Sequence, residues 1–148
     1  GGVTLDTWES YTFENDLLKL IFHGTPIANI ADNAASSPLT ALYLSLHTGD
    51  PGEAGDQTTS ECAYTSYARV AVNRNSGGWT SSGNSVVPAA NSEFPKGTGG
   101  SGTATHFGIG TASSGSGKLI CKGTISPSIA TGTGVIPRIT TDTTLTLD

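Results

Sequence analysis

Two histidines and a nearby carboxylate are the residues whose types and spacing could support catalysis. His47 and His106 lie in stretches where polar and apolar residues alternate, and Asp50 follows His47 by three positions, with many serines close by. A Ser-His-Asp hydrolase is defined by geometry, so the sequence leaves this class open. However, the chain has neither a G-x-S-x-G elbow nor an H-E-x-x-H motif. We therefore predict that the chain is not an enzyme, and that each histidine lies on a polar strand face or makes a buried hydrogen bond.

A group of carboxylates forms a second candidate site, of the kind that binds a hard cation such as Ca²⁺ through oxygen atoms of an irregular loop. Their spacing does not match the EF-hand, which needs acidic residues at alternate positions and a glutamate at the twelfth. We expect a solvated acidic loop and no metal. The residues concerned are Asp50, Glu53, Asp56 and Glu61.

Gly97, Gly99 and Gly102 match the G-x-G-x-x-G pattern of dinucleotide-binding loops. That fingerprint needs a strand before it and a helix after it, so that the pyrophosphate meets the helix N-terminus. Here Pro95 precedes the glycines and a strand pattern follows them. We predict a flexible turn and no cofactor.

The two cysteines, Cys62 and Cys121, allow one disulfide at most. No histidine spacing matches them, so they do not indicate a zinc site. We expect one small buried hydrophobic residue and one incidental thiol, in a protein made in a reducing cytosol.

The segment 39–72 is the centre of the predicted fold. Leu42, Leu44 and Leu46 alternate with Tyr43, Ser45 and His47, which is the pattern of a strand with one buried face. The following stretch, HTGDPGEAGDQ, is rich in Gly and Pro and is predicted to be a surface loop. Alternation resumes over residues 67–73 and predicts a second strand.

A short helix is predicted near the N-terminus, with Thr12 as its N-cap, an apolar stripe along one face and Gly24 after its last turn. A second, weaker helical turn is indicated over residues 27–35. Residues 1–11 show no periodicity and are predicted to form an arm. Its Trp8 would anchor onto a neighbouring molecule or pack onto its own domain.

Residues 12–148 are predicted to form one β-domain. The stretch around Trp79 is expected to be a turn cluster. Short extended segments separated by Gly, Ser and Pro follow it, and together with the single helix they predict a mainly β fold, a jelly roll or a β-sandwich. These segments cover residues 85–88, 91–94, 103–109, 118–125, 134–139 and 143–147.

Composition narrows the classes of partner. The formal net charge is −5, and charged residues make up only 13% of the chain, with no Lys/Arg cluster. A nucleic-acid partner requires a basic stripe, so none is expected. No apolar run approaches the length of a membrane span, and we expect no membrane partner.

The order of the motifs resembles a family of small virion proteins of tailed bacteriophages. In this sequence the family's Y-x-x-L-x-T-x-D-P-G-x-x-G stretch, Y-x-R motif, T-H-F-G-I-x-x-A segment and L-x-x-x-G strand are found between about Phe13 and Ile125. The matching residues are Tyr43, Leu46, Thr48, Asp50, Pro51, Gly52, Gly55, Tyr67, Arg69, Thr105, His106, Phe107, Gly108, Ile109, Ala112, Leu119 and Gly123.

The resemblance implies a structural protein of the virion, assembled in the host cytoplasm. Members are described as capsid cement (decoration) proteins or as tail-fibre-like proteins, and a jelly roll suits the former. We therefore expect a cement protein on the outer capsid surface that bridges major capsid protein subunits and forms a homo-oligomer. The alternative is a tail-fibre or baseplate component that binds a host surface, with the loop 97–102 among its contact tips.

The expected contact residues lie in the arm and in the acidic loop, and are Trp8, Thr48, Asp50, Glu53 and Asp56. The expected structural residues are those that support the loop and the core pairing, Tyr43, Tyr67, Arg69, His106 and Phe107.

Overall fold

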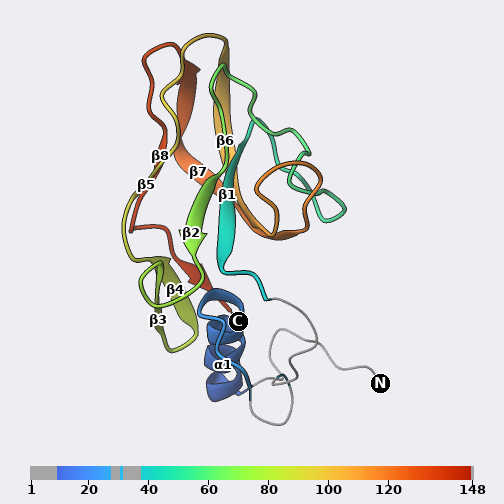
Figure 1. Ribbon diagram of the computed structural model, residues 1–148, viewed down its shortest axis with the longest axis vertical. Helices are drawn as coiled ribbons and strands as arrows, with labels where there is room; N and C mark the ends of the chain where they lie inside the picture. Colours follow the sequence, from blue (N-terminus) through green and yellow to red (C-terminus); the bar gives the residue numbers. More distant parts are fainter. Residues whose placement is uncertain (1–9, 28–30, 32–37, 148) are drawn as a thin grey trace. The chain divides into compact units, whose positions relative to one another are not determined.

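The computed structural model describes residues 10–27, 31 and 38–147, which divide into two compact units (Figure 1). The first unit comprises the described residues of Gly1–Thr40, together with Asn73–Asn91 and Thr140–Asp148. The second comprises Ala41–Val72 and Ser92–Ile139. The chain therefore passes from one unit to the other four times, and neither unit is a continuous segment.

The first unit contains α1 (Tyr11–Phe22). Ser10 caps it, because its Oγ accepts a hydrogen bond from the backbone N–H of Phe13 at 3.3 Å. The prediction of Thr12 as N-cap was therefore wrong by two positions, and Thr12 lies in the first turn. Gly24 follows the C-cap with a positive φ of 68°, as predicted for a residue in that place.

Three short strands in antiparallel order, β3 (Trp79–Ser82), β4 (Ser85–Pro88) and β9 (Leu145–Thr146), complete the first unit. The ring of Trp79 packs edge-on against that of Phe22, with centroids 4.6 Å apart. Trp79 is 1% exposed and is the first residue of β3, so its prediction as part of a turn cluster was wrong. Arg74 closes the end of α1 by donating to the carbonyls of Leu20 and Ile21, both at 2.6 Å.

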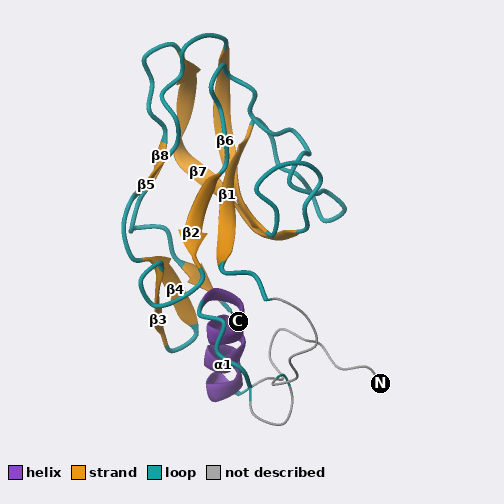
Figure 2. Cartoon of the chain, in the orientation of Figure 1, coloured by secondary structure: helices purple, strands orange, loops and turns teal. Residues whose placement is uncertain are grey.

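The second unit is built on a four-stranded antiparallel sheet in the order β2-β1-β6-β7 (Figure 2). Two more strands, β5 and β8, pair separately. The bounds are β1 (Ala41–His47), β2 (Val70–Asn73), β5 (Ser92–Glu93), β6 (Ser101–Gly110), β7 (Leu119–Gly132) and β8 (Arg138–Ile139). The fold is mainly β with one short helix, as predicted, and its antiparallel sheets are consistent with a β-sandwich.

The burial of β1 differs from the prediction. Leu42, Leu44 and Leu46 are buried as expected, but Ser45 and His47 on the opposite face are 0% exposed as well. The loop after β1 folds back over that face. Two backbone hydrogen bonds hold it there, one from the N–H of Thr48 to Ser60 and one from the N–H of Cys62 to Leu46. Period-two alternation records side-chain polarity and cannot show that a polar face is covered.

Other predicted boundaries moved as well. The strand expected to begin at Tyr67 begins at Val70, and β7 extends seven residues past the predicted end at Ile125. Trp8 and most of the helical turn predicted over 27–35 lie outside the described residues. The single-domain assignment of 12–148 stays a prediction.

Candidate functional site: a double loop beside the sheet

Two loops meet beside the sheet of the second unit, and we call them the double loop. They are the acidic loop, residues 48–61, and the β6–β7 loop, residues 111–118 (Figure 1). Gln57 joins them. Its side-chain amide donates to the carbonyl of Ala112 at 3.2 Å and accepts from the N–H of Ala112 at 2.9 Å. Its own N–H donates to Gly117 at 3.0 Å. Since Gln57 is 0% exposed, these bonds replace water and fix the position of the acidic loop.

An ion pair closes the base of the double loop. Arg69 donates to both carboxylate oxygens of Glu61, at 2.8 and 2.9 Å, in the bidentate geometry that guanidinium and carboxylate favour. Arg69 also donates to the carbonyls of Ala112 and Gly115, at 3.0 and 2.7 Å. Its side chain is 3% exposed. Arg69 thus holds both loops at once, and its hydrogen bonds to Glu61 raise its pKa.

Tyr67 extends this network towards the sheet. Its hydroxyl donates to Glu61 at 2.6 Å and accepts from the backbone N–H of Leu46 at 3.1 Å. Burial, together with its bond to Glu61, raises the pKa of Tyr67, so the hydroxyl keeps its proton as a donor. Glu61, expected to belong to the solvated acidic set, is instead the acceptor at the centre of this network.

Ser45 and His47 form a buried pair beneath the acidic loop. Nδ1 of His47 donates to the carbonyl of Thr59 at 2.7 Å, because a carbonyl can only accept. Nε2 therefore accepts from the hydroxyl of Ser45, at 2.8 Å. Burial is the main cause that lowers the pKa of His47. The pair has the hydrogen bond of a serine nucleophile with its base, but both residues are 0% exposed and a carbonyl takes the place of the third carboxylate.

Two carboxylates of the acidic loop, Asp50 and Asp56, bind within the loop or to β7. Asp50 pairs with Lys122 at 2.9 Å and accepts from the N–H of Gly52 at 2.9 Å. Asp56 accepts from the backbone N–H of Thr58 at 2.7 Å. These bonds lower the pKa of both carboxyls, Asp50 chiefly through Lys122 and Asp56 chiefly through the Thr58 hydroxyl. Within the described ranges, no group of three or more His, Cys, Asp or Glu residues is placed to hold a metal ion.

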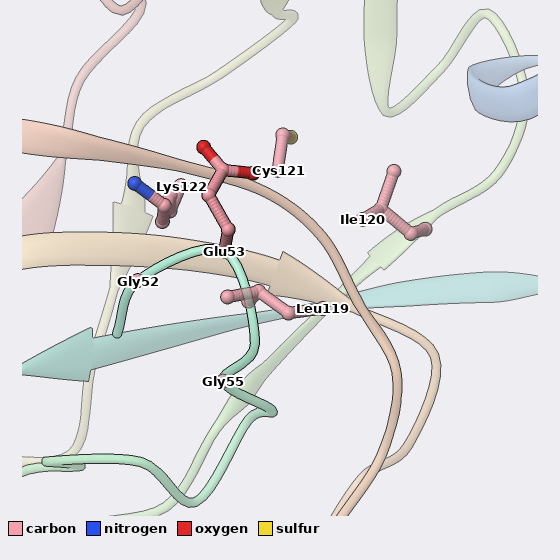
Figure 3. A pocket seen from close by; sticks show the side chains of 7 residues that line it. All are labelled: Gly52, Glu53, Gly55, Leu119, Ile120, Cys121 and Lys122. Atoms are coloured by element: carbon pink, nitrogen blue, oxygen red, sulfur yellow. The ribbon is translucent and has the colours of Figure 1, made fainter. Parts of the chain in front are cut away.

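A hollow of about 350 Å³ lies between the acidic loop and β7 (Figure 3). The turn 52–55 forms one side of it, and residues 119–122 of β7 form the other. Both cysteines are free thiols, and burial raises the pKa of Cys121, which lines the hollow, to about 12. The Cys121 thiol therefore keeps its proton near neutral pH, which disfavours it as a nucleophile.

The T-H-F-G-I segment of β6 places the strands on either side of it. A Cβ on Gly108 would lie 2.8 Å from Oγ of Ser45 and 3.0 Å from Nε2 of His47, so glycine leaves the space that the buried pair occupies. Likewise, a Cβ on Gly123 would lie 2.6 Å from the ring of Phe107, its partner across β6 and β7. The residues of the T-H-F-G-I motif therefore serve the packing of β6 against β1 and β7.

Residues 9–146 match the family model described as podophage GP4 fiber I protein gp80. The chain belongs to this family. It is a structural protein of a bacteriophage virion, as the motif resemblance implied. Comparison with curated proteins gives no match. Among the described helices, none is long and apolar enough to cross a membrane.

The structure separates the predicted residues of this family member into two groups. Thr48, Asp50 and Glu53 are exposed, and Asp56 lies half-buried in the same loop. Tyr43, Tyr67, Arg69, His106 and Phe107 lie in or against the sheet, where Tyr43 faces Gly110 and His106 faces His47 across β1 and β6. The loop 97–102 was expected to be a contact tip. Backbone hydrogen bonds join its Gly97 to Val135 and its Gly99 to Thr65.

Sequence reasoning missed Gln57 and Lys122. Gln57 is a polar residue in a Gly-rich loop and gives no periodic signal. Lys122 was read only as part of a strand. The charge of Lys122 in an otherwise apolar strand pattern was an available signal. The glycines at 110 and 117, where a Cβ would overlap the side chain of Gln57, are its neighbours only in the folded chain.

Proposed function

We propose that this chain is a fibre component of a podophage virion that contacts the surface of the host cell. The observation that carries the proposal is the match of residues 9–146 to a family described as a fibre protein. The match spans both compact units and therefore the double loop, rather than one shared segment. The capsid cement role, which the sequence analysis favoured, has no comparable support.

The architecture of the double loop supports this role. Loops that are held by a rigid scaffold bind partners at a lower entropic cost than loops that must order on contact. Here the base of the loops is fixed by Gln57, Arg69 and the bond from His47 to Thr59, while Asp50 and Glu53 remain exposed. The role proposed is binding rather than catalysis.

The partners proposed are a host-surface molecule and further copies of this chain within the fibre. Repeated copies would multiply weak contacts to the host surface. A cement protein would instead use the same loop, and Trp8, to bridge subunits of the major capsid protein. The two roles differ in copy number and in position on the particle.

Quantitative gel densitometry of purified virions, with immunogold labelling of this chain, tests the proposal. A fibre component is expected at a few per cent of the amount of the major capsid protein, with gold at the tail. About one copy per capsid subunit, with gold over the whole shell, would contradict the fibre role and establish the cement role.

A further inference from the structure

The hollow beside Glu53 combines the polar groups and the apolar floor that a sugar ring requires. Glu53 carries a carboxylate, which accepts hydrogen bonds from hydroxyl groups, and Lys122 carries an ammonium, which donates them. Figure 3 shows both side chains on the same side of the hollow, with Leu119 below them. Leu119 is half-buried and supplies an apolar surface for the C–H groups of a pyranose.

The ammonium group of the hollow and the turn beside it make their own bonds before any ligand arrives. Lys122 is fixed by its 2.9 Å ion pair with Asp50, and the turn that carries Glu53 is fixed at its start by the bond from Gly52 to Asp50. The far end of the acidic loop is anchored by Gln57. A site of this kind loses little conformational freedom on binding.

The charge of the hollow selects among sugars. Glu53 and Lys122 line the hollow with one charge of each sign, Asp50 pairs with Lys122 beside it, and the whole chain carries −5. Like charges repel, so an acidic sugar would be disfavoured. A neutral sugar would meet the Glu53 acceptor and the Lys122 donor without bringing a charge of its own.

From these observations we propose that the hollow is a subsite for a neutral hexose unit of the host's surface polysaccharide. This inference rests on the proposed function as a host-binding fibre component, and it names the chemical class that the fibre recognises. With an aliphatic floor and a single ring bound, the affinity of one site is expected to be about millimolar. Useful binding to a cell would come from several copies acting together.

The test uses the full chain and free sugars as probes. Backbone amide NMR spectra are recorded while glucose, galactose, mannose or N-acetylglucosamine is added, with N-acetylneuraminate as the acidic probe. At least one neutral sugar is expected to shift the amides of residues 52–55 and 119–122 and few others. Glu53→Gln and Lys122→Met are expected to weaken that binding at least tenfold. Glu93→Gln is the matched control, because Glu93 is exposed in a separate ion pair with Arg138.

Three outcomes overturn the inference: no neutral sugar shifts these amides, the two variants bind as well as the control, or the acidic sugar binds more tightly than the neutral ones. Binding of the purified chain to host cells separates this inference from the proposed function. If the chain binds the cells and Glu53→Gln binds them equally well, the hollow is not the subsite and the fibre role stands. If the wild-type chain does not bind the cells, the host-contact role itself is wrong.

Discussion

The residue with the most consequential contacts is Arg69, which links the two halves of the double loop. Its ion pair with Glu61 is buried, with 3% of the Arg69 side chain and 16% of the Glu61 side chain exposed. A buried charge that loses its partner keeps its desolvation penalty without the compensating attraction. Removing one member of the pair is therefore expected to lower the stability of the fold, because the other charge stays buried without a partner.

Glu61→Gln is expected to lower the free energy of unfolding by about 3 kcal/mol, because Arg69 and the Tyr67 hydroxyl lose their charged acceptor. Urea unfolding followed by tryptophan fluorescence measures the change. Glu93→Gln removes an exposed ion pair whose side chains are 51% and 57% exposed, and should change stability by less than about 1 kcal/mol. Equal effects of the two substitutions would show that the buried network does not hold the loop.

His47 makes stability depend on pH. Burial lowers its pKa from the ordinary value of 6.5, so the unfolded chain takes up a proton at a higher pH than the folded chain does. Stability should then fall as pH decreases below about 6.5, with a slope of at most about 1.4 kcal/mol per pH unit from this group, and should level off below the pKa of the folded state.

Urea midpoints measured between pH 7 and pH 5 test this expectation. The groups facing His47 are Glu61, Arg69 and His106, and the Glu61 charge opposes the effect of burial. The control is His47→Gln, which keeps a polar group but cannot titrate, and its midpoints should vary less with pH. An unchanged pH dependence in that variant would assign the effect to other groups.

At the scale of secondary-structure elements, the packing of side chains over β1, β6 and β7 depends on one glycine. Gly108 faces Ser45 in the strand register, and a methyl group at Gly108 would meet Ser45, His47 and the side chain of Leu119 within 3.0 Å. Since all three atoms belong to packed elements, they cannot all move aside.

Gly108→Ala is expected to destabilise the chain by about 1–3 kcal/mol and to loosen the acidic loop above the buried pair. Thermal unfolding gives the first quantity, and hydrogen exchange of the amides of Thr48 and Cys62, which bond across the base of that loop, gives the second. Gly49→Ala is the control, because a Cβ there would approach, among the described residues, nothing nearer than Ser60 Oγ at 3.9 Å. If the two variants unfold alike, close packing of side chains at Gly108 does not contribute to stability.

At the scale of the whole molecule, the two compact units share one interrupted chain. Segments of the second unit, Ala41–Val72 and Ser92–Ile139, are joined only through Asn73–Asn91 of the first. If either unit unfolds, the chain segments of the other unit lose the connection that keeps their ends together. We expect one cooperative transition by differential scanning calorimetry, with equal calorimetric and van't Hoff enthalpies. Two separate transitions would show that the units are independent domains and that the single-domain prediction is wrong.

Local patterns in the sequence determined the class of fold and the family. Gly- and Ser-rich turns, the alternating leucines of β1 and one capped apolar stripe were enough to predict a mainly β chain with a single N-terminal helix. These properties depend on neighbours in sequence, so short windows reveal them. The same patterns placed the helix cap at Thr12 instead of Ser10, since both side chains can cap and only the backbone geometry selects one.

The site, in contrast, was decided by tertiary structure. Ser45 and His47 alternate like solvent-facing residues, and only the folded-back loop buries them. Gln57 joins Ala112 across 55 residues, and Arg69 joins Ala112 across 43, distances at which a single sequence carries no pairing signal. Lys122 meets Asp50 because β7 returns beside the acidic loop. Charge and polarity can be read from the chain, but which charges meet and which polar groups lose water depends on long-range packing.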